Sequence, residues 1–114
     1  MSVKASVIVR SYNRIPALLE LLEKLRSQDF GSFEIIIVEQ STNYEKENWS
    51  ELNVLIAKDS RIKLHKYDPL GGPKARNEGV RNASGEILIF VDDDDLPISN
   101  KWIQKHVQSY RFNR

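Results

Sequence analysis

Four consecutive aspartates, Asp92 to Asp95, directly follow the apolar run ILIFV at residues 87–91. Adjacent carboxylates repel one another, so such a run is costly at the end of a buried strand unless a counter-ion is near. Closely spaced carboxylate oxygens suit a hard divalent cation such as Mg²⁺ or Mn²⁺. Magnesium takes one or two carboxylates together with phosphate oxygens, so a diphosphate would complete the site. The alternative is a solvated acidic turn in which Asp95 or Ser99 caps the next helix.

A second stretch, PLGGPKARNEGV at residues 69–80, places two glycines before a basic helix start. Such glycines let the backbone approach an anion, and the first turn of a helix offers free N–H groups. Lys74 and Arg76 add positive charge there. Neither G-x-x-x-x-G-K-[ST] nor G-x-G-x-x-G occurs, which disfavours nucleoside triphosphatases and dinucleotide-binding enzymes. The alternative is a loop with a basic first helical turn and no ligand.

A few other side chains could take part in binding or catalysis. Tyr12 could stack on a base and Asn13 could fix a turn, although packing is the alternative for Tyr12. His65 falls in an alternating strand pattern and His106 on the inward side of the last helix, and both are interpreted as structural. The chain contains no cysteine, which excludes disulfides, thiolate metal sites and a cysteine nucleophile.

These residues need a scaffold, and the sequence alternates short apolar runs with helical patterns. The expected strands are Ala5–Arg10, Phe33–Glu39, Ile62–Tyr67 and Glu86–Asp92. The expected helices are Ile15–Gln28, a polar helix from about Tyr44, Lys74–Ala83 and Asn100–Arg111. Strands that alternate with helices predict βαβ units with right-handed crossovers. The predicted fold class is therefore α/β, a Rossmann-like, mainly parallel sheet with flanking helices.

Finer features of these elements are also predicted. Three strands are continuous apolar runs, as is typical of strands covered on both faces. Thr42 and Asn43 are expected to cap the second helix, while Val54–Ala57 is compatible with helix or strand. The predicted inward residues are Ala75, Gly79, Val80 and Ala83 in the third helix, and Ile103, Val107 and Tyr110 in the last.

Polar residues follow three of the four predicted strands: residues 10–13, residues 39–41 and the aspartates that begin at Asp92. In open α/β sheets, ligands bind beyond the carboxyl ends of the strands. We therefore expect these three segments to meet at one rim of the sheet.

The totals fit one modest domain, or a piece of a larger one, without a strong overall charge. The chain has 114 residues, of which 17 are basic and 16 acidic. This balance gives no general attraction to nucleic acid. No run approaches the roughly 20 apolar residues of a membrane span, and the first residues do not form a signal peptide. The expectation is a soluble, cytoplasmic protein without a membrane span or nucleic-acid partner.

The segments that carry a family resemblance, by their order and spacing, are SVIVRSYNR, FEIIIVEQST and GGPKARNEGVRNASGEILIFVDDDDLP. With these segments the sequence resembles the family 2 glycosyltransferases, which have the GT-A fold. The resemblance covers nearly the whole chain. It implies that residues 1–114 form the N-terminal nucleotide-sugar-binding part, with the acceptor-binding half and its catalytic base absent. The implied activity is metal-dependent transfer of a sugar from a nucleoside diphosphate sugar to an acceptor, with Mg²⁺ or Mn²⁺ as cofactor.

The resemblance also implies roles for residues that match the family's motifs. Asp92–Asp94 occupies the D-x-D element, so Asp94 is the primary predicted metal ligand. Tyr12 matches the position of a residue beside the base, and Glu39 matches an acidic residue that contacts uracil or ribose. Arg76 matches a position where a basic residue near the nucleotide is common. The predicted nucleotide-sugar-binding residues are Arg10, Tyr12, Glu39, Lys74, Arg76, Asp92 and Asp93, and the predicted metal ligands are Asp94 and Asp92.

Two positions depart from the family's pattern. The family usually has two adjacent acids after the second strand, whereas this chain has Glu39-Gln40. Arg10 stands where a small residue, often threonine or proline, is typical. Both bear on the identity of the base, for which uridine, and hence a UDP-sugar, is the leading candidate.

Parts of the sequence are compatible with other functions. A non-catalytic nucleotide-binding or self-associating module is the alternative. A nucleotidyltransferase is disfavoured because RSYNRIP lacks the glycine-rich basic loop usual after the first strand. The run Ile87–Val91 carries no lysine or proline, so as a sheet edge it would invite another chain. This predicts a homo-oligomer through that edge, unless the helix Asn100–Arg111 covers it.

Overall fold

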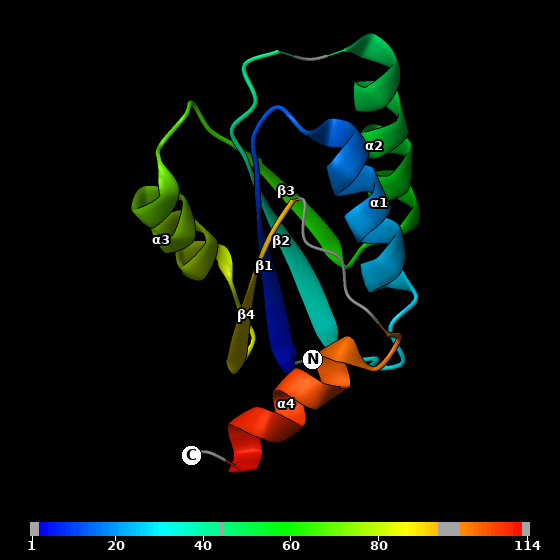
Figure 1. The fold of residues 1–114 in the computed structure, drawn as a ribbon, viewed down its shortest axis with the longest axis vertical. Helices are drawn as coiled ribbons and strands as arrows, with labels where there is room; N and C mark the ends of the chain where they lie inside the picture. The colour runs from blue at the N-terminus through cyan, green and yellow to red at the C-terminus, as the bar shows by residue number, and fades with distance from the viewer. Residues whose placement is uncertain (1–2, 44, 94–98, 113–114) are drawn as a thin grey trace.

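The computed structural model describes residues 3–43, 45–93 and 99–112 of the chain (Figure 1). Within these residues four strands alternate with four helices, which confirms the predicted α/β organisation. The strands are β1 Ala5–Ser11, β2 Phe33–Glu39, β3 Ile62–Lys66 and β4 Ile87–Asp92. The helices are α1 Ile15–Arg26, α2 Lys46–Lys58, α3 Gly72–Asn82 and α4 Trp102–Phe112.

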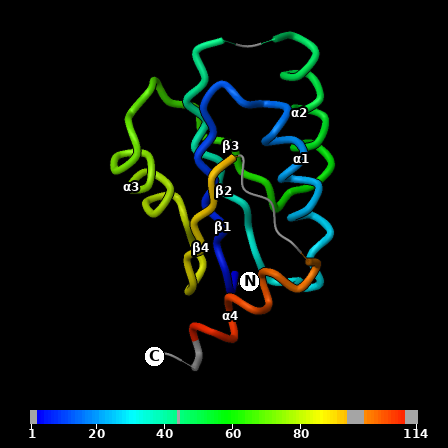
Figure 2. Tube along the Cα trace, in the orientation of Figure 1, coloured from blue at the N-terminus to red at the C-terminus, as the bar shows by residue number. Residues whose placement is uncertain are grey.

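The four strands form one parallel sheet in the order β3-β2-β1-β4. Helices α1 and α2 cover one face and α3 covers the other, while α4 lies near the amino ends of the strands (Figures 1 and 2). The arrangement confirms the predicted Rossmann-like, mainly parallel sheet. Because all strands run the same way, their carboxyl ends meet at one rim.

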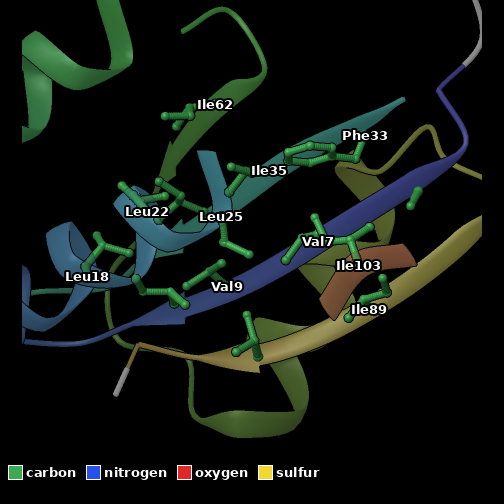
Figure 3. Close-up of a cluster of buried hydrophobic side chains, with 14 of the residues drawn as sticks. Val7, Val9, Leu18, Leu22, Leu25, Phe33, Ile35, Ile62, Ile89 and Ile103 are labelled. Carbon is green, nitrogen blue, oxygen red and sulfur yellow. The ribbon is translucent and has the colours of Figure 1, made fainter. Parts of the chain in front are cut away.

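The main core lies between the sheet and α1 (Figure 3). Helix α1 buries five residues at the spacing of one helical face: Ile15, Leu18, Leu21, Leu22 and Leu25. Val7 and Val9 of β1 point into this core, and the alternating Ile8 faces α3 instead. Strands β1 and β2 are therefore covered on both sides, as their apolar sequences predict.

Helix α3 packs against the other face through small residues. Ala75 and Gly79 are buried, as predicted, and Gly79 lies directly over Ile8. Val80 is 43% exposed, so its predicted inward orientation is wrong. The helix approaches the sheet so closely that only the narrow line through Ala75 and Gly79 makes contact, and the next residue is turned away. Ala83 follows the helix as its C-cap and is half-buried.

Other expectations about the helices need correction. The second helix begins at Lys46 without a side-chain cap, and residues 54–57 belong to it. Thr42 and Asn43 do not cap it, because Glu45 occupies the N-cap position. Their N–H groups donate to Asn13 Oδ1 at 2.9 and 3.2 Å. Asn13 adopts a left-handed conformation with φ 52°, which asparagine tolerates better than most residues. Its predicted role in fixing a turn is confirmed.

The C-terminal elements differ from expectation in what they bury. In β4, Leu88 and Phe90 are 37% and 39% exposed, so this strand is covered on one face only within the described residues. In α4, Val107 is buried, whereas Tyr110 is 46% exposed and His106 is exposed. The reason is that α4 runs outward past the end of the sheet, so its last turns leave the core (Figure 1).

The start of α4 is fixed by hydrogen bonds to Gln28, which follows α1 in the sequence. Gln28 donates to the carbonyl oxygen of Ser99 at 2.9 Å and accepts from Ile103 N at 3.0 Å. Ser99 Oγ accepts from Lys101 N at 3.3 Å. The predicted cap Asp95 lies outside the described residues.

Strand β4 is the outer strand of the sheet in the described residues. This matches the edge expected for residues 87–91, and pairing of that edge with a second copy stays a prediction. None of the described helices is long and apolar enough to cross a membrane.

A buried carboxylate, Glu34 of β2, joins the amino ends of three strands. Glu34 Oε2 accepts hydrogen bonds from Ser6 Oγ at 2.6 Å and from Ser84 N and Oγ at 2.7 and 2.9 Å. Lys63 Nζ donates to Oε1 at 2.9 Å. Burial alone raises the pKa of Glu34, but these hydrogen bonds outweigh it and lower the pKa from 4.5 to about 2.

Gly85, which precedes β4, lies against the backbone of β1. A Cβ there would lie 2.7 Å from the Ala5 carbonyl carbon and from Ser6 N, closer than carbon and nitrogen atoms pack. Gly85 N also donates to Ser6 Oγ at 2.8 Å. The glycine in the sequence ASGE is therefore required for close approach between the two strands.

The variant Gly85→Ala is expected to lower the free energy of unfolding by about 1–3 kcal/mol, the usual cost of overpacking. Urea unfolding followed by circular dichroism measures this loss. Gly31→Ala is the matched control, since Gly31 also precedes a strand but a Cβ there meets no atom within 4 Å. Equal losses in the two variants would contradict the close-approach explanation.

Candidate functional site

A cleft of about 500 Å³ lies at the carboxyl ends of the strands. Its lining residues are Arg10, Tyr12, Arg14, Gln40, Pro69, Gly71, Gly72, Asp92 and Asp93. A smaller hollow of about 250 Å³ shares Arg10 and Asp92 with it and adds Arg76 and Phe90. The three polar segments predicted to meet at one rim do so, and the glycine-rich loop before α3 joins them.

Arg10 and Asp92 form an ion pair across the floor of the cleft. They occupy paired register positions on the neighbouring strands β1 and β4. Arg10 Nε and Nη2 donate to Asp92 Oδ1 at 2.9 and 2.7 Å. Arg10 thus supplies positive charge beside Asp92, the first of the four aspartates, where the sequence leads us to expect a counter-ion.

Asp93 connects the aspartate segment to the loop after β1. Its side chain is buried, and Oδ2 accepts a hydrogen bond from Tyr12 N at 3.0 Å. Arg14 Nη1 lies 3.9 Å from Oδ1. The carboxylate therefore holds the backbone that carries Tyr12, whose own side chain is 51% exposed at the cleft.

Glu39 lies behind the cleft and is fully buried. It follows the same alternation as Ile37, so it points to the face covered by α1 and α2. Its Oε1 accepts from the backbone N and the hydroxyl of Ser41, and Ser41 Oγ accepts from Asn13 N at 2.8 Å. Glu39 Oε2 and Ser11 Oγ are buried without a hydrogen-bond partner among the described residues. Glu39 thus positions the Asn13 loop and keeps one oxygen available for a further bond.

Gln40 faces the cleft and was not among the predicted site residues. Its side chain is buried, and Oε1 accepts from Leu70 N at 2.8 Å, which anchors the glycine-rich loop. Arg14 was missed as well. The signals were present in the sequence, because Gln40 replaces the family's second acid and Arg14 ends the SYNR motif.

The two glycines of this loop are needed for different physical reasons. Gly71 has φ 81°, a left-handed conformation that costs glycine little and other residues more. Gly72 makes room for an arginine, since a Cβ there would lie 2.7 Å from Arg10 Nη1. Both glycines line the cleft, as expected for a loop that lets a ligand approach the backbone.

The two predicted basic residues of α3 lie apart from the main cleft. Arg76 places its guanidinium carbon 4.4 Å from the centroid of the Phe90 ring and lines the smaller hollow. Lys74 is exposed and lines neither space. The structure therefore brings together Arg10, Tyr12, Asp92 and Asp93, places Arg76 next to them, and keeps Glu39 and Lys74 outside the lining.

The residues around the cleft offer carboxylate oxygens to a divalent cation. The described residues contain no group of three or more His, Asp or Glu side chains placed to hold one. Asp94, the primary predicted metal ligand, lies outside the described residues. Asp92 faces an open cleft, and Mg²⁺ needs only one or two carboxylates when phosphate oxygens complete its ligands. The donor chemistry therefore fits a cation shared with a diphosphate.

Comparison with known proteins places these features in a family. The model of the family described as Glycosyl transferase family 2 matches residues 6–114. An uncharacterized glycosyltransferase of Bacillus subtilis, YwdF, is 41% identical over 96 residues, which cover 82% of this chain and 33% of that protein. A β-1,3-glucosyltransferase of Campylobacter jejuni that acts on GalNAc(5)-diNAcBac-PP-undecaprenol is 35% identical over 101 residues, covering 84% and 31%.

A solved structure agrees with the sequence relatives. The chain resembles residues 1–349 of TarS from S. aureus in complex with UDP-GlcNAc, with a TM-score of 0.79 and 31% identity. The match covers 96% of this chain and 31% of that one. The chain therefore spans about a third of each of the two sequence relatives and of the 1–349 segment of TarS.

Proposed function

Because the chain belongs to glycosyl transferase family 2, we propose that its cleft binds a nucleoside diphosphate sugar and that the whole protein transfers the sugar to an acceptor. The observation that carries this proposal is the cleft itself, which lies beyond the carboxyl ends of the parallel strands. It combines arginines and glycines suited to a diphosphate with aspartates suited to a cation. The complex of TarS with UDP-GlcNAc supports a uridine nucleotide as the donor.

We assign the base to the part of the cleft beside Tyr12. The exposed Tyr12 ring offers a stacking surface at the rim. Glu39 lies behind this lining with Oε2 buried and unpartnered among the described residues, and the base or ribose would donate a hydrogen bond to this oxygen by displacing the residues in front of it. Arg76 supplies positive charge on the other side, next to the hollow that continues the cleft.

We assign the diphosphate and its cation to the aspartate segment, with Asp94 and Asp92 as ligands. When bound there, a divalent cation neutralises the negative charge that develops on the departing diphosphate. The chain's own contribution is to place carboxylates and arginines around one space before the donor arrives, so that less reorganisation is needed.

Calorimetric titration with UDP, GDP and ADP, each with and without Mn²⁺, tests the proposal. We expect UDP to bind most tightly and Mn²⁺ to strengthen its binding. Absence of nucleotide binding would contradict the proposed site, and tighter binding of GDP or ADP would contradict the uridine assignment. Nucleotide binding without any donor cleavage by the whole protein would favour the alternative, a non-catalytic binding module.

The variant Glu39→Gln is expected to weaken UDP binding by about tenfold or more, since a hydrogen bond to a charged group contributes roughly 1.5–3 kcal/mol. Glutamine keeps an oxygen for Ser41, so the Asn13 loop should stay in place. Glu47→Gln is the control, because Glu47 is an exposed residue in the first turn of α2. Unchanged UDP affinity in Glu39→Gln, with an unchanged melting temperature, would contradict the assignment of Glu39.

A further inference from the structure

Arg10 holds an unusual position in the cleft, because it neutralises a carboxylate of the aspartate segment. It lies 82 positions from Asp92 in sequence, yet two of its nitrogens donate to the same oxygen, Asp92 Oδ1. Both side chains remain partly exposed, at 37% and 48%. The pair therefore borders the space in which a donor and its cation would bind.

The third nitrogen of the guanidinium is directed elsewhere. Arg10 Nη1 faces the first turn of α3, where only a glycine at position 72 leaves room for it. Among the described residues Nη1 has no hydrogen-bond partner. A planar guanidinium can bind two anions through different edges. Arg10 can thus contact Asp92 and, from the same position, an anionic group in the cleft.

A guanidinium and a divalent cation on one carboxylate repel each other, because both are positive and only a few ångströms apart. The arginine also occupies lone pairs of Asp92 Oδ1, so this oxygen is less available to a cation. Binding of one therefore weakens binding of the other. At the same time the guanidinium supplies a counter-charge for a diphosphate that requires no metal ion.

We propose that Arg10 sets how strongly donor binding depends on a divalent cation, by competing with the cation for Asp92 and by offering the diphosphate a permanent positive charge. This inference rests on the proposed binding of a nucleoside diphosphate in the cleft. It gives Arg10 a specific role at a position where the family typically has a small residue: the wild-type chain binds the nucleotide appreciably without metal, and Mn²⁺ strengthens that binding by a smaller factor than it would with threonine at position 10.

The test compares the wild-type chain with Arg10→Thr. Calorimetry measures UDP affinity with and without Mn²⁺, and electron paramagnetic resonance of free Mn²⁺ measures binding of the metal alone. In Arg10→Thr, we expect metal-free UDP affinity to fall by about fivefold, the range of a partly exposed ion pair. We expect Mn²⁺ to bind more tightly and to increase UDP affinity by a larger factor than in wild type.

Two further variants make the test specific. Arg81→Thr removes the same charge from an exposed position at the far end of α3 and should leave the effect of Mn²⁺ unchanged. In the Asp92→Asn background, Arg10→Thr should no longer tighten Mn²⁺ binding, because the shared carboxylate is gone. Melting temperatures confirm that each variant is folded.

The outcomes separate this inference from the proposed function. Unchanged Mn²⁺ affinity and an unchanged Mn²⁺ effect on UDP binding in Arg10→Thr would overturn the inference, while wild-type UDP binding would still support the proposed function. If the wild-type chain binds no UDP either with or without Mn²⁺, this result overturns the proposed function and, with it, the role of Arg10 toward a donor.

Discussion

Replacing Glu34 with alanine should lower the free energy of unfolding by about 1–3 kcal/mol. Glu34 is 2% exposed and accepts from Ser6, Ser84 and Lys63. Its removal leaves the buried Ser6 hydroxyl without its acceptor, which costs about 1–3 kcal/mol, whereas the exposed Ser84 and Lys63 can bond to water instead. Against a typical total of about 5–15 kcal/mol, this loss is large enough for thermal unfolding and urea unfolding to measure it.

The exposed Glu20 of α1 provides the control. Glu20→Ala removes the same functional group from a surface position, and such changes usually stay within about 0.5 kcal/mol. Similar losses in Glu34→Ala and Glu20→Ala would show that the hydrogen bonds around Glu34 contribute little.

The lowered pKa of Glu34 also predicts how the free energy of unfolding changes in acid. Because the folded-state pKa of Glu34 is lowered from 4.5 to about 2, its ionised form stabilises the fold above pH 4.5. That stabilisation, about 3 kcal/mol by proton linkage, is lost as the pH falls from 4.5 toward 2. Glu34→Gln removes this dependence, so the stability difference between wild type and variant should narrow over that range. A constant difference from pH 6 to pH 2 would refute the assignment.

In the variant Asp94→Asn, the Mn²⁺-dependent part of UDP binding should disappear. Asp94 is the last residue of the D-x-D element in the sequence, and asparagine lacks the charge that a hard cation requires. Binding that does not need metal should persist through the arginines of the cleft. Calorimetry with and without Mn²⁺ measures both parts separately.

Asp68→Asn is the matched control, since Asp68 is exposed in the loop before the glycine pair. The variant Asp94→Asn also removes one of four adjacent like charges, so its melting temperature without metal should be equal to or higher than that of wild type. Equal Mn²⁺-dependent affinity in Asp94→Asn and wild type would rule out Asp94 as the metal ligand.

Much of the architecture could be predicted because it depends on local patterns. Apolar runs of five to seven residues, separated by helical periodicity and turn residues, predict parallel βαβ units. Parallel strands place their carboxyl ends on one rim, so the convergence of Arg10, Tyr12 and Asp92 was predictable without knowing any contact. The family resemblance rested on the same segments, and its prediction of a glycosyltransferase of family 2 is confirmed.

Errors arose where burial depends on what lies opposite a residue. Val80 and Tyr110 have the spacing of inward residues, but α3 touches the sheet along one narrow line and α4 leaves the sheet before its last turn. Phe90 continues an apolar strand, yet it is 39% exposed within the described residues and has the Arg76 guanidinium over its ring. Periodicity states which residues share a face, whereas the distance and length of the neighbouring element determine whether that face is buried.

The sequence by itself determined the order of the elements, the parallel sheet and the three polar segments at its rim. Only the tertiary structure decided how those segments are connected. Glu39 and Gln40 are adjacent, but one points behind the sheet and the other into the cleft, because successive side chains alternate and different helices cover the two faces. The contact between Arg10 and Asp92 likewise depends on the pairing of β1 with β4 and on its register. Such long-range contacts are set by packing of the whole sheet, which no local pattern encodes.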